Sequence, residues 1–167
     1  MSVALRSLTI CPIVEKIDSL PINQLTTESV RQALEGLAQV AAWVDSQKLL
    51  LTRRLQELAA ASPAVIPAQV IASACGVTRS EAQRGVARVS TLDLVPQLET
   101  ALTTGTVSIA HIDAVTQAMA HLSEPEKQQV AIQGNWINMV ASHTTPDNFA
   151  RAVRRAVQQI HTDAGLT

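Results

Sequence analysis

Side chains able to carry chemistry are most concentrated in the segment 69–84, where a short apolar run is followed by a glycine and then by arginine, serine and glutamine. A short helix, a glycine turn and a capped second helix are typical of a helix-turn-helix, whose second helix begins in the DNA major groove. Arginine and glutamine there can bind guanine and adenine edges. The candidate DNA-binding residues are Arg79, Ser80, Gln83, Arg84 and, one turn later, Arg88.

An ordinary corner between two helices explains the same segment, with its arginines simply hydrated. In the helix-turn-helix interpretation, Gly76 supplies the turn and Thr78 and Glu81 form a capping box at the start of the second helix. That interpretation also predicts a small internal cluster of apolar side chains, made by Ile71, Cys75, Val77 and Ala82. Both interpretations stay open at the level of sequence.

A secondary basic patch is expected on the last helix, where Arg151, Arg154 and Arg155 lie off the apolar stripe. Asp147 precedes Arg151 by four residues, a spacing that favours an ion pair. Hydrated arginines on a solvent face are the simpler explanation of this patch. The stripe itself is predicted to face the core and consists of Phe149, Val153, Ala156, Val157 and Ile160.

Catalytic and metal-binding patterns are not found in the sequence. The four histidines, His111, His121, His143 and His161, form no pair at the three- or four-residue spacing of a helical metal site. Cys11 and Cys75 are too far apart in sequence for a CxxC site, and they suggest no disulfide. A glycine-rich phosphate loop and a serine elbow are also missing. We expect no cofactor, no metal and no enzymatic activity.

The composition predicts an all-α protein. Hydrophobic residues make up 47% of the 167 residues and aromatic residues only 2%, and alanine is abundant. Alanine favours helices, whereas strands are rich in aromatic and β-branched residues. The formal net charge of −1 argues against a protein that wraps nucleic acid non-specifically. No apolar run is long enough to cross a membrane, and no signal peptide is recognised at the start, so a cytoplasmic location is expected.

The positions of proline, glycine and capping residues, which mark helix starts and ends, predict a compact multi-helix bundle with a long N-terminal helix and the helix-turn-helix-like corner. Residues 1–24 are expected to be an irregular leader, and residues 25–167 a single helical domain. The long helix should run from Thr26 or Thr27 to about Ala61, with Gly36 as a point of interruption or bending. The later helices are expected over 67–75, 78–91, 96–104, 108–121, 123–142 and 145–163.

One face of the long helix is apolar, because its apolar residues are spaced three and four apart. These residues are Val30, Ala33, Leu34, Leu37, Ala41, Val44, Leu51, Leu55 and Leu58. Trp136 has a similar spacing from its apolar neighbours and is interpreted as a core residue, not as a platform on which bases stack.

The order of these pieces resembles the DUF222 family, also called the 13E12 repeat family, of actinobacteria and their phages. The resemblance covers about residues 25–167, and its most specific part is the stretch from Leu94 through Pro96 and Gly105 to Ser108 and His111. Val95 is inserted into the usual Leu-Pro order. The resemblance implies an all-helical region that precedes an HNH nuclease domain in longer relatives; the HNH motif itself is absent here.

Two functions follow as expectations. The first is a non-catalytic module that recognises double-stranded DNA or positions a nuclease domain on it. The alternative is a protein–protein interaction or self-association module without nucleic-acid binding, because the alanine-rich faces of the helices permit close approach and the net charge is nearly neutral.

Overall fold

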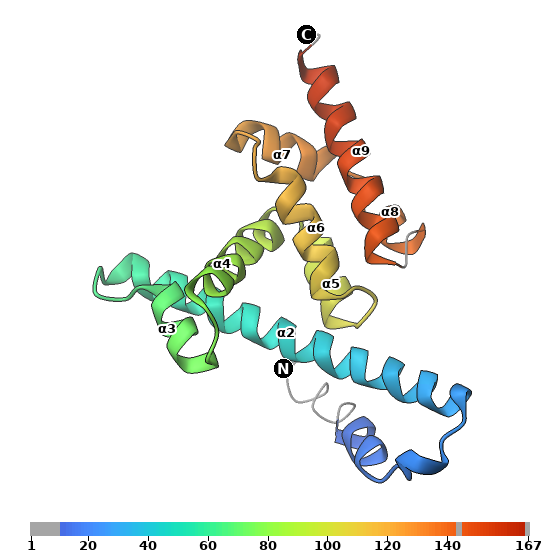
Figure 1. Ribbon diagram of the computed structural model, residues 1–167. Coiled ribbons are helices and arrows are strands. Elements are labelled where there is room, and N and C mark those ends of the chain that lie inside the picture. Colours follow the sequence, from blue (N-terminus) through green and yellow to red (C-terminus); the bar gives the residue numbers. More distant parts are fainter. Residues whose placement is uncertain (1–10, 143–144, 166–167) are drawn as a thin grey trace.

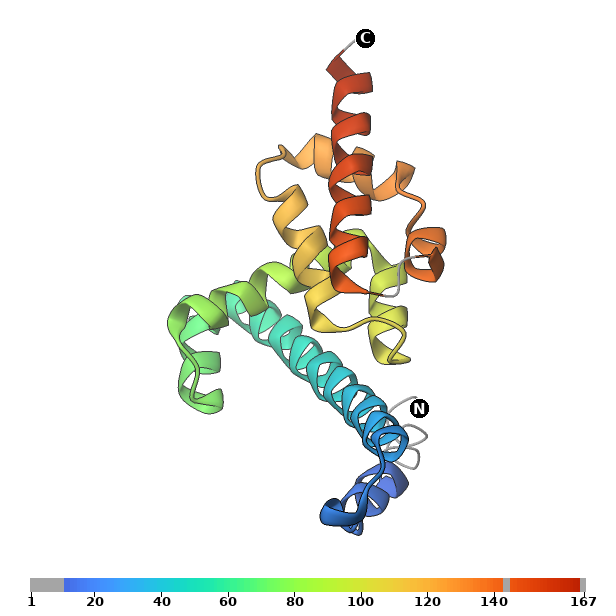
Figure 2. The same cartoon turned by 45° about the vertical axis from the view of Figure 1, so that its right-hand side comes forward.

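The computed structural model describes residues 11–142 and 145–165, and within these ranges the chain is helical with no strand. The expected all-α fold is therefore confirmed. A short 3₁₀ turn (η1, Ile22–Gln24) precedes the long helix α2 (Thr27–Ala61). After it come a corner of two helices and a group of shorter helices stacked on one side of α2 (Figures 1 and 2). Their bounds are α3 Pro67–Cys75, α4 Arg79–Leu94, α5 Pro96–Thr103, α6 Ile109–Met119, α7 Glu124–Gln133, α8 Trp136–Ser142 and α9 Pro146–Gly165.

The expectation of an irregular leader is wrong for part of its length, because residues 11–18 form a helix. This helix approaches α2 closely at Gly36, where a Cβ atom would lie 3.2 Å from Cγ2 of Ile13. The sequence suggested that Gly36 interrupts α2, but the helix continues through it. The missing side chain of Gly36 instead makes room for the preceding helix. The prediction that the start of the chain is not a signal peptide concerns residues that lie almost entirely outside the described ranges.

Helix α2 begins and ends as predicted, but its buried face is not the apolar face seen in the sequence. Its N-cap Thr26 accepts a hydrogen bond from the Ser29 amide. Only Ala42, Ser46, Leu49 and Thr52 are buried on this helix. The predicted apolar face is displaced around the helix axis from these residues and lies largely in solvent. The first 15 residues of α2, 27–41, contribute no buried side chain at all.

The hydrophobic core is formed where α4, α5, α6, α7, α8 and α9 meet the C-terminal part of α2. The predicted stripe of α9 faces this core, with Phe149, Val153 and Val157 buried. The ring of Phe149 packs 5.0 Å from that of His111, measured between centroids. His111 is itself buried and belongs to the N-terminal cap of α6, where its Nδ1 accepts from the Ser108 amide at 3.2 Å.

The expected single helix over 123–142 is in fact two helices. Its start is as predicted, since Ser123 and Glu126 form the capping box of α7. The helix stops at Gly134, whose backbone is extended. The buried Trp136 then folds back over this corner, and its indole N–H donates to the carbonyl of Ala131 at 3.0 Å. Trp136 is thus a core residue, as expected, and also the reason that the helix is broken.

A three-way ion pair ties α2 to the stacked helices. The guanidinium of Arg53 donates from Nη1 to Glu99 on α5 at 2.9 Å, and from Nε to Asp93 on α4 at 2.9 Å. The hydrogen bond to Glu99 is the largest cause of the raised pKa of Arg53. The adjacent Arg54 is exposed and forms an ion pair with Glu57, three residues further along the same helix. The two adjacent arginines therefore differ in role: Arg53 links three helices, and Arg54 is hydrated.

Candidate functional site

The corner between α3 and α4 has the local geometry predicted for it. Helix α3 ends at Gly76, which adopts the left-handed conformation (φ 64°, ψ 32°) that favours glycine. Thr78 then caps α4 by accepting from the Glu81 amide at 3.1 Å. The Glu81 side chain forms ion pairs with two arginines of α4, so only half of the expected capping box is made in this way.

Four of the five candidate DNA-binding residues are exposed on the first two turns of α4: Arg79, Ser80, Gln83 and Arg84. Arg84 forms an ion pair with Glu81 at 2.6 Å, and its side chain stays 60% exposed. The candidates Arg151, Arg154 and Arg155 are also exposed. They lie on α9, in a part of the molecule distant from this corner (Figures 1 and 2). The sequence favoured an ion pair between Arg151 and Asp147, but Arg151 instead donates a hydrogen bond to the side chain of Asn148.

Arg88 does not point outward with the others, which corrects the expectation from sequence. Its side chain is only 12% exposed. Two guanidinium nitrogens donate to the Asp113 carboxylate on α6, Nε to Oδ1 at 2.7 Å and Nη2 to Oδ2 at 2.9 Å, and Nη1 donates to Glu81 at 2.8 Å. The hydrogen bond to Asp113 is the largest cause of the raised pKa of Arg88. Arg88 is thus engaged in holding α4 against α6.

The predicted internal cluster of the corner is formed only in part. Ala82 is buried as expected, whereas Cys75 and Val77 are exposed and Ile71 is half-buried. Ile71, Cys75 and Val77 line an open groove instead of filling a core. Cys75 is a free thiol, as is Cys11.

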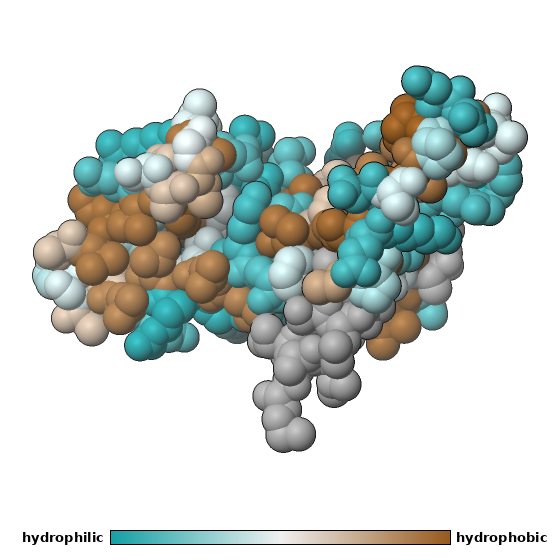
Figure 3. Space-filling model, turned by 90° about the horizontal axis from the view of Figure 1, so that it is seen from below, coloured by the Kyte–Doolittle hydropathy of each residue, from teal (hydrophilic) through white to brown (hydrophobic). Residues whose placement is uncertain are grey.

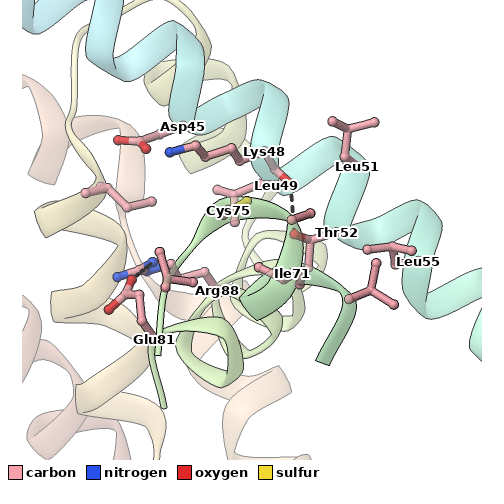
Figure 4. Close-up of a pocket in the computed structure, with 15 residues that line it drawn as sticks. Asp45, Lys48, Leu49, Leu51, Thr52, Leu55, Ile71, Cys75, Glu81 and Arg88 are labelled. Atoms are coloured by element: carbon pink, nitrogen blue, oxygen red, sulfur yellow. Dashed lines mark hydrogen bonds and ion pairs between the residues drawn. The ribbon is translucent and has the colours of Figure 1, made fainter. Parts of the chain in front are cut away.

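This groove lies between α2, α3 and α4 and has a volume of about 250 Å³ (Figure 4). Its apolar wall comes from the predicted face of α2 on one side and from α3 on the other, chiefly Leu51, Leu55, Val70, Ile71 and Ala74. Gly85 also lines it, and no atom lies within 4 Å of the position that a Cβ atom would take there. Seen from below, a hydrophobic surface covers this end of the molecule (Figure 3).

Charged side chains gather at one end of the groove, where Asp45 and Lys48 of α2 approach Glu81 and Arg88 of α4 (Figure 4). Burial raises the pKa of Asp45, and the positive charges of Lys48 and Arg88 oppose that rise. The site therefore combines an apolar trough with a polar end. Such a surface suits the apolar face of a helix better than a small polar substrate.

Within residues 11–142 and 145–165 no group of three or more His, Cys, Asp or Glu side chains is arranged to hold a metal ion. His121 is exposed, whereas the side chains of His143 and His161 lie outside what the structure describes. In the same described part, no helix is both long and apolar enough to cross a membrane.

The groove was missed at the level of sequence because it depends on how three helices meet. The leucines of α2 were recognised as one face, but their position beside Val70 and Ala74 of α3 has no local signal. The partner of Arg88 was missed for the same reason, since Asp113 is 25 residues away. Only Glu81, seven residues before Arg88, could have been noticed from its spacing.

The fold and the groove together define a class: an all-α protein with a long, partly unpacked helix and a corner of two helices beside it. No family model matches the chain, and no curated protein and no solved structure matches it either.

Proposed function

We propose that this chain is a non-catalytic helical interaction module, and that its groove between α2, α3 and α4 binds an amphipathic helix of a protein. The observation that supports this most is the apolar lining of an open groove by Leu51, Leu55 and Val70, of which Leu51 is 67% exposed. Large apolar side chains concentrated on one surface are typical of interaction sites. An amphipathic helix would cover them with side chains spaced three and four apart.

A fluorescent three-heptad helix with leucine at positions a and d is the probe that tests this proposal. We expect the full chain to raise its anisotropy in a saturable way. The Ala74→Arg variant should weaken binding about 30-fold, because a long charged side chain would occupy the apolar trough. Ser73→Arg is the matched control, since Ser73 is exposed on the same helix and does not line the groove. No binding, or equal loss in both variants, would contradict the proposal.

The second candidate is recognition of duplex DNA, and it rests on the exposed first turns of α4. Two features of the geometry favour DNA binding. Gly76 makes the left-handed turn between the helices, and the side chains that follow it on α4 are exposed to solvent: Arg79, Ser80, Gln83 and Arg84. The resemblance to the helical region that precedes HNH nuclease domains supports the same candidate. Its binding surface is smaller than the sequence suggested, because Arg88 is engaged with Asp113.

An electrophoretic shift with mixed-sequence duplex DNA at low salt tests this second candidate. We expect the double variant Arg79→Ala, Arg84→Ala to bind at least about tenfold more weakly and to show a shallower dependence on salt, because each arginine contacts a phosphate or a base. Arg54→Ala removes an exposed arginine of α2 and should leave binding unchanged. If the unaltered chain gives no shift at micromolar concentration, this candidate fails.

A further inference from the structure

An unpaired seam runs along α2 for most of its length. The positions 30, 34, 37, 41, 44, 48, 51, 55 and 58 alternate steps of four and three residues without interruption, which is the heptad spacing of a coiled coil. All are apolar except Lys48. Over this span the seam is about 42 Å long at 1.5 Å per residue. Its members are exposed except for Val44 and Leu55, which are half-buried.

We infer that the helix that fills the groove is α2 of a second copy of this chain, paired along the seam in antiparallel orientation. This inference deepens the proposed function, on which it rests, by naming the partner. The N-terminal half of α2 carries Val30, Leu34 and Leu37 at 41%, 60% and 47% exposure, and among residues 11–142 and 145–165 no element of the core covers them. The C-terminal half carries the apolar groove. Antiparallel pairing brings each exposed half into the groove of the other copy.

In a two-fold symmetric dimer, the contact between the N-terminal half of α2 and the groove is formed twice, by the same residues each time. In a closed dimer the same patch is used by both copies, so each groove receives the N-terminal half of the partner's α2. Val70 and Ala74 of α3 then flank the incoming helix and extend the contact beyond a simple two-stranded coil. A parallel pair would instead place the two exposed halves together and set each α3 corner against the other.

The charges of α2 favour the same orientation. Residues 27–44 contain two acidic and one basic side chain, a net charge of −1, whereas residues 45–61 contain three basic and two acidic side chains, a net charge of +1. Antiparallel pairing sets the negative half against the positive half. The one polar seam residue, Lys48, would face Lys48 of the other copy in a parallel pair in register, and it faces an apolar layer in an antiparallel one.

Light scattering over a concentration series tests the pairing. We expect the mass to rise from 17.8 kDa to twice that value as the concentration of the full chain increases. Leu34→Glu should raise the dimer dissociation constant at least about 100-fold, because it would bury a charge in the seam. Leu50→Glu is the matched control, since Leu50 is exposed on α2 but lies off the seam. A monomer at every concentration, or equal loss in both variants, overturns the inference.

Disulfide mapping tests the orientation, in a background where Cys11 and Cys75 are replaced by serine. Chains with Leu34→Cys should cross-link to chains with Leu51→Cys or Leu58→Cys and not to themselves. Self-linked Leu34→Cys chains would show a parallel pair and overturn the inference. If the chain stays monomeric but binds the leucine-heptad probe, the proposed function stands and only the identity of the partner is wrong. If both fail, the groove is not a helix-binding site.

Discussion

Replacing Arg88 with alanine is expected to lower the free energy of unfolding by about 3 kcal/mol or more, one of the two largest effects of a single substitution that we expect for this protein. The physical reason is that Asp113 would keep its charge in a half-buried position after losing two hydrogen bonds of 2.7 and 2.9 Å. Glu81 would lose a third contact. Chemical denaturation at neutral pH, followed by circular dichroism of the helices, measures the change.

The control for Arg88 is Arg84→Ala, which removes an exposed arginine from the same helix. That variant should change the free energy of unfolding by less than about 0.5 kcal/mol, because exposed ion pairs contribute little. The double variant Arg88→Met, Asp113→Leu should be more stable than Arg88→Ala, since it leaves no charge without a partner. If Arg88→Ala and Arg84→Ala prove equally mild, Arg88 does not hold α4 to α6.

Replacing Trp136 with alanine is expected to cost about 4 kcal/mol, because it removes the largest fully buried side chain and the hydrogen bond from its indole to Ala131. The effect includes the corner at Gly134, where a Cβ atom would lie 2.5 Å from Cε2 of the indole ring. Calorimetry of thermal unfolding measures this loss: the change in melting temperature is converted into a change in the free energy of unfolding at the transition midpoint.

Two further variants make the Trp136 measurement specific. Ile137→Ala alters the next residue, which is 71% exposed, and should be nearly neutral. Gly134→Ala should destabilise by about 1–3 kcal/mol, because the added methyl group must displace the ring. If Trp136→Ala is as mild as Ile137→Ala, the side chain does not hold α7 and α8 together.

The positions of the helices could be largely predicted because their signals are local. Thr26, Gly76 and Ser123 each act on the backbone within a few residues, and each ends or begins a helix where the sequence placed it. The break at Gly134 was missed because it needs the Trp136 ring to fold back, and the helical spacing around Trp136 is equally compatible with one continuous helix. Local periodicity cannot distinguish these two arrangements.

The candidate site could be predicted only as a set of residues on α4. Exposure of Arg79 and Arg84 follows from helical geometry, but the inward position of Arg88 depends on Asp113 from another helix. The face of α2 posed a similar problem, because periodicity predicts that apolar residues share a face without saying what covers it. In the described part of the chain, Ala42 and Leu49 of α2 are buried in the core, whereas the leucines of the seam lie outside it.

The unequal burial of α2 also gives the molecule a mechanical property. The core holds this helix from Ala42 onward, so the residues from 27 to 41 form a rigid arm of about 22 Å, fixed at one end. Gly105 lies beside the arm at Gln39, close to the point where the arm leaves the core: a Cβ atom added at Gly105 would be 3.5 Å from Cγ of Gln39. A tilt of about 10° at that point would move the far end of the arm by about 4 Å. Any such tilt would therefore be largest at the first turn of α2.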